Sequence, residues 1–188
     1  WRPDSKRNVN MATFQTRIDY NDFLRDVPDF PKPGILFKDI TPLLSAPAAF
    51  DASIADLCDL AAAYKPTHIA GIESRGFLFG APMAQQMGIS FIPVRKPGKL
   101  PWKTYSCDYE LEYGKNTLEL HTDAACAGDR VLLIDDLLAT GGSADAAIQL
   151  LRKTGAEIMA ALFVVELDFL NGRKKLHGTP ISSLVHVS

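Results

Sequence analysis

The sequence contains the stretch Val131-Leu-Leu-Ile-Asp-Asp-Leu-Leu-Ala-Thr-Gly-Gly-Ser143, and the rest of the predicted fold is arranged around it. Its first residues, Val131 to Ile134, form a continuously apolar run, which is typical of a strand buried on both faces of a parallel sheet. We expect Asp135 and Asp136 to lie where this strand ends. Such a pair is either an ordinary solvated feature of a loop or a site that holds a polyol or a metal ion.

The residues after the aspartates predict a tight turn into a helix. Gly141 and Gly142 supply the backbone freedom that the turn needs, and Ser143 is a candidate cap for the helix. The helix is indicated by the apolar residues Ala146, Ala147, Leu150 and Leu151. The N–H groups of the turn and the helix dipole together favour a phosphate. The segment has neither the Gly-Lys-Ser/Thr of a P-loop nor the glycine pattern of a dinucleotide-binding fold.

The composition fits a globular chain without a general affinity for polyanions. The chain has 188 residues, of which 47% are hydrophobic and 22% charged, and its formal net charge is -2. This balance predicts neither nucleic acid nor a membrane as a partner, so phosphate binding depends on local basic residues. The three cysteines are odd in number and lack zinc-site spacing, which indicates a reducing, cytoplasmic location.

The order of predicted elements indicates an α/β fold in a single domain of residues 11–188. Residues 1–10 are polar and precede Met11, a candidate native start, so we treat them as a leader outside the domain. Strands are predicted at about 68–72, 90–95, 131–134, 157–166 and 181–187, and helices at about 16–26, 45–64, 77–87 and 143–154, with a short helix after Asp168. This alternation predicts a parallel sheet of about five strands with helices on both faces.

Two further places along the chain are candidate anion sites. The first is a loop between a predicted strand and a helix N-terminus, formed by Glu73, Ser74 and Arg75. The second is a basic run at the carboxyl end of the next strand, where ligands of such sheets bind, formed by Arg95, Lys96 and Lys99. The alternatives are a surface salt bridge for Arg75 and a solvated turn for the basic run.

Two segments outside the predicted sheet are candidate covers for a site. Residues 28–39 contain three prolines and Gly34, which predicts a rigid extended loop within an N-terminal hood of about residues 16–45. From Tyr105 to His121 apolar and polar residues alternate around a turn, which predicts an antiparallel hairpin. We expect this hairpin, within about residues 99–121, to be a flap that closes over an active site.

Five blocks of the sequence carry a resemblance to a known family. They are Pro28-Asp-Phe-Pro-Lys-Pro-Gly-Ile-Leu-Phe-Lys-Asp39, Glu73-Ser-Arg-Gly-Phe-Leu-Phe-Gly80, Val94-Arg-Lys-Pro-Gly-Lys-Leu-Pro101, Leu111-Glu-Tyr-Gly114 and Asp135-Asp-Leu-Leu-Ala-Thr-Gly-Gly142. In this order they resemble the adenine phosphoribosyltransferase family, a branch of the type I phosphoribosyltransferases. The resemblance starts at about Arg17 and covers nearly the rest of the chain. Ser143 in place of a commoner threonine, and Glu73 in place of a frequent aspartate, are mild departures.

The resemblance implies a reaction and a set of site residues. The family joins adenine to phosphoribosyl diphosphate (PRPP) with Mg²⁺, forms AMP and releases pyrophosphate, usually as a cytoplasmic homodimer. By resemblance, the 5′-phosphate of PRPP binds Ala139, Thr140, Gly141, Gly142 and Ser143; the ribose, directly or through a metal, binds Asp135 and Asp136; the pyrophosphate binds Glu73, Ser74, Arg75, Arg95, Lys96 and Lys99; and adenine binds Leu36, Phe37 and Lys38. Mg²⁺ is expected to bind mainly through PRPP, without a dedicated protein cage.

Ala139 favours adenine over other bases. Family members for 6-oxopurines typically carry an acidic residue near this position, where it acts on the base, and alanine cannot do so. Glu112, on the polar face of the predicted flap, is the candidate catalytic group for the imidazole edge of adenine, with a solvated hairpin charge as the alternative. Two other functions stay open: a phosphoribosyltransferase for another base, and a PRPP-sensing regulator without catalysis. The regulator predicts a DNA-binding segment or an incomplete flap, and the sequence shows neither.

Overall fold

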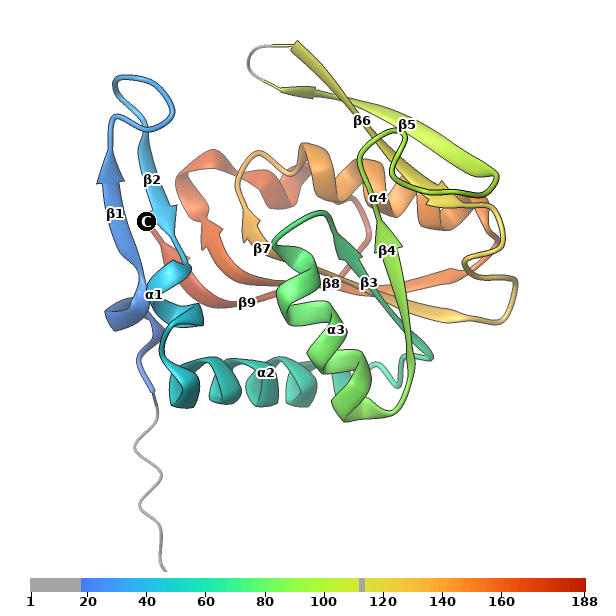
Figure 1. Ribbon diagram of the computed structural model, residues 1–188, viewed down its shortest axis with the longest axis horizontal. Coiled ribbons are helices and arrows are strands. Elements are labelled where there is room, and N and C mark those ends of the chain that lie inside the picture. Colours follow the sequence, from blue (N-terminus) through green and yellow to red (C-terminus); the bar gives the residue numbers. More distant parts are fainter. Residues whose placement is uncertain (1–17, 112–113) are drawn as a thin grey trace, which may run out of the picture.

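The computed structural model describes residues 18–111 and 114–188 (Figure 1). The predicted leader, residues 1–10, and the predicted catalytic residue Glu112 therefore lie outside the described residues. No helix in the described ranges is both long and apolar enough to cross a membrane.

Five parallel strands form the central sheet, and this confirms the predicted α/β fold. The order across the sheet is β4-β3-β7-β8-β9. The chain enters this sheet at β3, moves to the edge strand β4, and then continues on the other side of β3 through β7 and β8 to the edge strand β9. The strands are β3 (His68–Ile72), β4 (Ser90–Val94), β7 (Arg130–Leu138), β8 (Glu157–Leu167) and β9 (Ile181–Val187).

Helices cover both faces of this sheet because successive residues of β7 point to opposite sides. Leu132 and Ile134 belong to the apolar cluster that includes residues of α2 and α3. Val131 and Leu133 belong to a second cluster, which includes residues of α4 on the other face (Figure 1). The helices are α1 (Thr41–Leu44), α2 (Pro47–Ala62), α3 (Gly76–Met87) and α4 (Gly142–Lys153). The central strand is thus buried on both faces, as its apolar run predicts.

Two antiparallel hairpins stand beside the sheet (Figure 1). They consist of β1 (Arg25–Pro28) with β2 (Leu36–Asp39), and of β5 (Thr104–Leu111) with β6 (Gly114–His121). The second pair confirms the hairpin predicted between Tyr105 and His121. Its base is part of the core, because Leu118 and Leu120 are buried in the cluster that includes α4.

The structure corrects the predicted N-terminal helix and refines a second prediction of local structure. In place of a helix at about 16–26, Tyr20–Phe23 form a 3-10 helix (η1) and Arg25–Pro28 form β1. Pairing with β2 explains this, since a partner strand elsewhere in the chain overrides a weak helical pattern. The short helix predicted after Asp168 is present as two 3-10 helices, η2 (Asp168–Leu170) and η3 (Gly172–Lys175).

The strand that carries the two aspartates is longer than predicted. β7 pairs with β3 only as far as Ile134, but it pairs with the longer β8 as far as Leu138. Asp135 and Asp136 therefore lie beyond the end of one neighbouring strand and still inside the ladder with the other. The prediction that the aspartates lie at the end of their strand therefore holds for the pairing of β7 with β3, but not for its pairing with β8.

Candidate active site

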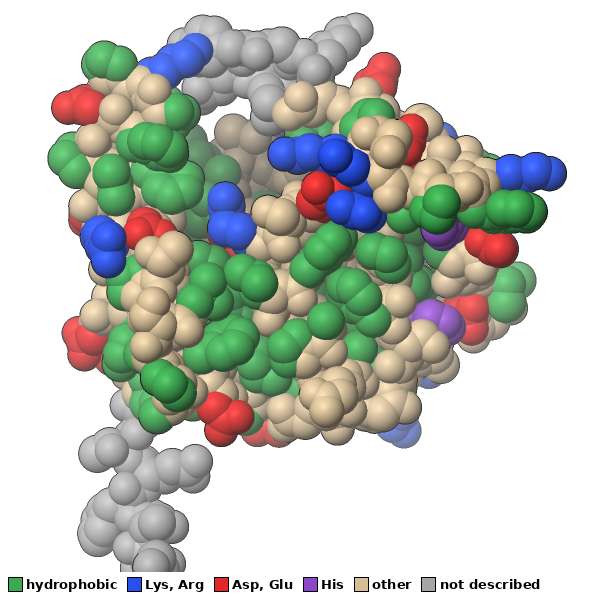
Figure 2. All heavy atoms as spheres, viewed as in Figure 1, with side chains coloured by type: hydrophobic (Ala, Val, Ile, Leu, Met, Phe, Trp, Pro, Cys, Tyr) green, Lys and Arg blue, Asp and Glu red, His purple; other side chains and the backbone are tan. Residues whose placement is uncertain are grey.

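A cavity of about 210 Å³ lies at the carboxyl end of β7. Its lining includes both aspartates, the whole loop 139–143, Arg75 and Tyr109. Figure 1 shows the carboxyl ends of the central strands between the two hairpins, and Figure 2 shows basic side chains near the middle of this face. The fold therefore brings Arg75 together with residues 135–143, predicted site residues that are some sixty positions away in the sequence.

An ion pair between Arg75 and Asp136 lies at this cavity. The Nε of Arg75 donates to Oδ2 of Asp136, whose side chain is 5% exposed. Burial and the neighbouring charge of Asp136 raise the pKa of Asp135 well above its usual value, and the charge of Arg75 opposes this shift. Two buried carboxylates beside one guanidinium leave an excess of negative charge, which ribose hydroxyls or a cation would stabilise.

The loop after β7 turns into α4 at Gly141. This residue has φ +80°, a left-handed conformation that glycine adopts without steric cost. The helix begins at Gly142, and the amide of Asp145 donates to the carbonyl oxygen of Gly141 at 2.9 Å. The predicted cap at Ser143 is wrong because the cap position falls on Gly141; Ser143 lies in the first helical turn and lines the cavity. Amide groups in this turn suit an anion.

Glu73 organises the basic turn after β4. Its carboxylate accepts hydrogen bonds from Nε of Arg95 and from the backbone nitrogen of Lys96, both at 3.1 Å. Arg95 in turn donates from Nη1 to the carbonyl oxygen of Lys99 at 3.1 Å. Although burial disfavours the Glu73 carboxylate, the hydrogen bonds from Lys96 and Arg95 lower its pKa. Glu73 thus holds cations in place and is not itself suited to bind an anion.

The N-terminal hairpin reaches the same site through Phe37. The Cζ atom of Arg75 lies 5.8 Å from the centroid of the Phe37 ring, within the range of a cation–π contact. The ring of Phe30 packs edge-on against Phe37 with centroids 5.1 Å apart. The ammonium of Lys38 is paired with Asp26 in the same hairpin. Of the three residues predicted to bind adenine, Phe37 is therefore the one whose side chain contacts Arg75 in the described part of the chain.

Tyr109 lines the cavity, although it was not predicted from the sequence. Burial raises the pKa of its phenol, a hydrogen bond with Asn116 opposes the shift, and the charge of Asp135 adds to it. The residue lies on β5, on the face that also carries Tyr105 and Cys107. The alternating pattern of this strand was the available signal, because it separates the face of Tyr105, Cys107 and Tyr109 from the polar residues Ser106 and Asp108.

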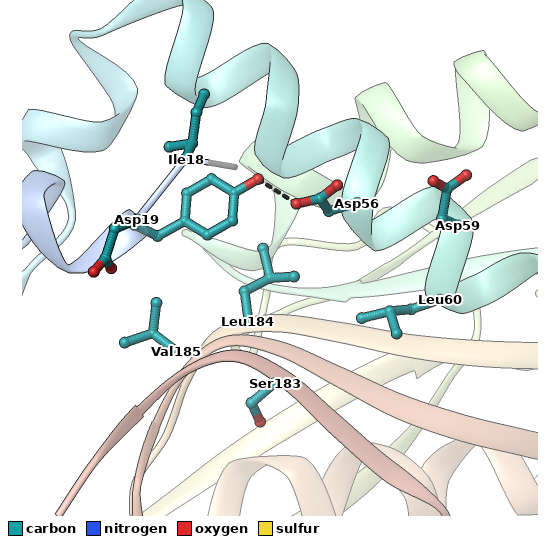
Figure 3. Close-up of a pocket in the computed structure, with 9 residues that line it drawn as sticks. Ile18, Asp19, Asp56, Asp59, Leu60, Ser183, Leu184 and Val185 are labelled. Atoms are coloured by element: carbon teal, nitrogen blue, oxygen red, sulfur yellow. Dashed lines mark hydrogen bonds between the residues drawn. The ribbon is translucent and has the colours of Figure 1, made fainter. Parts of the chain in front are cut away.

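A second hollow, of about 780 Å³, lies between η1, α2 and β9 (Figure 3). Carboxylates of Asp19, Asp56 and Asp59 line it, and Asp56 accepts a hydrogen bond from the hydroxyl of Tyr20 at 2.6 Å. A lining that is rich in carboxylates does not suit a phosphorylated ligand. Ile18, which lines this hollow, is the first residue that the structure describes, so the lining is given for residues from Ile18 onward.

The aspartate pair has the donor chemistry of a Mg²⁺ site. Asp135 and Asp136 offer carboxylate oxygens, which hard cations prefer, together with room for ligand oxygens in the adjoining cavity. Among residues 18–111 and 114–188, one group of three side chains has converging ligand atoms: Glu166, Asp168 and His186. There, however, Arg173 bonds to both carboxylate oxygens of Glu166, whereas Arg75 bonds to one carboxylate oxygen of Asp136. A cation therefore fits the aspartate pair better.

Comparison with known proteins points to one family. The model of the phosphoribosyl transferase domain matches residues 42–183. The adenine phosphoribosyltransferase of Methylococcus capsulatus is 55% identical over 163 residues, which are 87% of this chain and 95% of the relative. The crystal structure of the adenine phosphoribosyltransferase from Thermoanaerobacter pseudethanolicus has a TM-score of 0.87 at 51% identity, over 89% of this chain and 97% of that chain.

A further similar structure contains ligands. The adenine phosphoribosyltransferase of Saccharomyces cerevisiae, complexed with an imino-altritol 1,6-bisphosphate and adenine, has a TM-score of 0.83 at 43% identity. The similarity covers 87% of this chain and 95% of that chain. A sugar bisphosphate and adenine thus bind together in a relative of the same fold.

Proposed function

The chain belongs to the adenine phosphoribosyltransferase family of purine-salvage enzymes, and on this premise we propose how its own residues make AMP from adenine and PRPP. The observation that carries the proposal is the cavity in which the Arg75–Asp136 pair lies beside the loop 139–143. Breaking the bond from ribose C1 to pyrophosphate creates charge on both fragments, so the site must stabilise both and exclude water.

Each part of PRPP is assigned to one part of the site. The amides of loop 139–143 bind the 5′-phosphate, and Asp135 and Asp136 hold the ribose hydroxyls. The pyrophosphate is bound by residues of the loop before α3 and of the basic turn after β4, namely Ser74, Arg75, Arg95, Lys96 and Lys99. Glu73 orients Arg95 and Lys96 directly, and Lys99 through Arg95. Carboxylates suit the positive charge that develops on the ribose, and cationic groups suit the negative charge of the departing pyrophosphate.

Mg²⁺ is proposed to bind with PRPP next to the aspartate pair. When bound, it would neutralise charge on the departing pyrophosphate. Asp135 and Asp136 would contribute carboxylate oxygens to the metal, and PRPP would supply most of its other ligands.

Adenine is proposed to stack on Phe37, with its edge read by backbone groups of Leu36 and Lys38. A backbone donor and acceptor distinguish a 6-amino from a 6-oxo purine because the wrong edge leaves a buried polar group unpaired. Ala139 offers no acid to a 6-oxopurine. Glu112, which lies outside the described residues, is proposed to handle the proton of the imidazole edge.

The test is an assay for pyrophosphate release with PRPP, Mg²⁺ and a panel of bases. Adenine should be used, and hypoxanthine, guanine, xanthine and orotate should be poorer by a factor of roughly 10⁴. Comparable turnover of hypoxanthine would refute the assignment of the base. Binding of PRPP without turnover of any base would instead favour a regulator.

We also propose that the enzyme is a cytoplasmic homodimer. Leu78 on α3 is 42% exposed, and β4, which lies beside α3, is an edge strand of the sheet. Figure 2 shows apolar side chains spread over this face of the molecule. A second copy would cover this surface. The three free thiols, Cys58, Cys107 and Cys126, suit a reducing compartment. Sedimentation equilibrium at micromolar concentration should give the mass of two chains.

A further inference from the structure

The phosphate loop rests against a segment with no role predicted from the sequence, the turn between η2 and η3. A Cβ atom built on Gly172 would lie 2.2 Å from the carbonyl oxygen of Ala139 and 3.1 Å from the amide nitrogen of Gly141. A Cβ atom on Gly141 would lie 2.5 Å from the carbonyl oxygen of Gly172. The two backbones are therefore in direct contact, and a side chain at either glycine would push them apart.

Arg173 ties this turn to the end of β8. Its guanidinium donates from Nε and Nη2 to the two carboxylate oxygens of Glu166, with Nη2 at 2.7 Å from Oε2. It also donates from Nη1 to the carbonyl oxygen of Ile181 at 3.2 Å. The Glu166 side chain is 3% exposed and accepts a further hydrogen bond from the hydroxyl of Ser183 at 2.7 Å. A bidentate pair of this kind fixes orientation as well as distance.

Glu166 lies beside the start of the same loop. In the register of β7 and β8 it is the partner of Leu138, which directly precedes Ala139. The β8 residue Glu166 therefore lies next to the start of the loop and binds Arg173. The neighbour of Arg173, Gly172, contacts the backbone of the same loop at Ala139 and Gly141. At the other end of η3, Leu176 is buried in the cluster that includes α4, so the turn is held from both sides.

We propose that Arg173 is a positioning residue for the 5′-phosphate of PRPP, acting through the contact of Gly172 with Ala139 and Gly141. This inference rests on the proposed function, in which loop 139–143 binds that phosphate. Amide donors bind an anion tightly only when they are held in place before it arrives. The loop contains two glycines, and its support from behind replaces the rigidity that side chains would supply.

The test compares two partial ligands on the full-length protein by calorimetry. Arg173→Gln removes the bidentate pair and should weaken binding of ribose 5-phosphate by roughly tenfold or more, by analogy with residues that orient the ligands of a metal ion. Pyrophosphate is assigned to Arg75 and to the basic turn after β4, so the affinity of the protein for pyrophosphate should change less than twofold. In the kinetic assay, the KM for PRPP should rise while kcat at saturation stays near the parent value.

Two variants make the result specific. Lys174→Gln removes a charge from the next, exposed position of η3 and should bind both ligands as the parent does. Gly172→Ala leaves Arg173 and Glu166 unchanged but places a methyl group against the loop, so it should show the same selective loss of ribose 5-phosphate binding. It also serves as the test if Arg173→Gln does not fold.

The outcomes separate this inference from the proposed function. Parent-like binding of ribose 5-phosphate by folded Arg173→Gln and Gly172→Ala would overturn the positioning role and leave the proposed function intact. Equal weakening of both ligands would overturn it too, because a general loss of structure produces that result. A parent protein that binds neither ribose 5-phosphate nor AMP would overturn the proposed function and this inference together.

Discussion

Asp135 is the residue at which the stability of the ligand-free protein and its function oppose each other. It is buried beside Asp136, and burial and repulsion raise its pKa well above the usual value. A carboxyl with a raised pKa in the folded state binds its proton more tightly there than in the unfolded chain. Its contribution to stability is therefore present at low pH and is lost as the pH rises through the folded-state pKa. A ribose or a cation bound at this carboxylate would offset that loss.

We expect Asp135→Asn to stabilise the ligand-free protein at pH 7–8. The amide cannot ionise, yet it keeps an oxygen for the amide of Asp136, which donates to Oδ1 of Asp135 at 3.0 Å. Thermal unfolding should give a Tm higher than that of the parent by roughly 2–4 °C, the shift that about 1 kcal/mol produces in a chain of this size. The difference should shrink toward pH 4, and turnover with PRPP should fall.

The matched control for this substitution is Asp51→Asn, at an exposed position of α2. Its Tm difference from the parent should not follow the same pH profile. A lower Tm for Asp135→Asn than for the parent at pH 8 would contradict the expected sign of the effect.

Glu112→Gln tests the proposed proton transfer at the imidazole edge of adenine. The amide keeps the size and hydrogen bonding of the side chain but cannot take up a proton. Binding of PRPP and adenine should survive, while kcat should fall by roughly 10²–10⁴, the range for loss of a general acid or base. Calorimetry and the kinetic assay together measure both quantities. Parent-like turnover would mean that Glu112 is a solvated charge of the hairpin.

The β5–β6 hairpin is predicted to close over the site as a flap, and contacts at its base limit how it can move. Its base is attached to α4, because Nζ of Lys153 donates to the carbonyl oxygen of Ser106 at 2.9 Å and Sγ of Cys107 contacts Oε1 of Gln149 at 3.6 Å. A backbone bridge between Arg95 and Glu119 ties β6 to the end of β4. We therefore expect any closure to bend the hairpin beyond its base and not to swing the whole element.

Lys153→Ala should loosen the base of this hairpin. Loss of one hydrogen bond between a charged group and the backbone is worth about 1.5 kcal/mol, so amide hydrogens of residues 104–108 should exchange roughly tenfold faster. Hydrogen exchange followed by mass spectrometry measures this, with Lys174→Ala as the charge-matched control. Equal acceleration in β7 would show a global loss of stability and would count against local attachment.

At the scale of the whole molecule, α3 lies unusually close to the sheet. A Cβ atom on Gly80 would be 2.8 Å from Cγ2 of Ile134 and 2.8 Å from Cε2 of Phe91. Glycine at this position lets the helix approach β7 and brings Arg75, at the N-terminus of α3, to Asp136. The distance between helix and sheet thereby sets the position of the ion pair in the site.

Gly80→Ala should destabilise the protein by about 1–3 kcal/mol through overpacking, although alanine is the better helix former by roughly 1 kcal/mol. Urea unfolding measures the difference. The companion substitution Ala81→Gly lies at an exposed position of the same helix and should cost only the propensity difference. A stabilised Gly80→Ala would mean that helix propensity, and not the contact with Ile134, decides at this position.

Much of the fold could be predicted because its signals are local. The apolar run from Val131 to Ile134 predicts a strand buried on both faces, and the bounds predicted at 68–72 and 181–187 agree with β3 and β9. Gly141 is needed where the backbone is left-handed, and a glycine pair is visible in any sequence. Side-chain hydrophobicity and backbone freedom belong to single residues and their neighbours, so the sequence by itself determined these elements and the phosphate loop.

The remainder depends on partners that are distant in the chain. β1 forms because β2 pairs with it, and β7 continues past Asp135 because β8 is long enough to pair with it. The ion pair of Arg75 and Asp136 joins residues 61 positions apart, and Gly172 supports a loop that precedes it by some thirty residues. Pairing across a sheet and backbone packing depend on which segments meet, and neither periodicity nor propensity records that. Only the tertiary structure decided them.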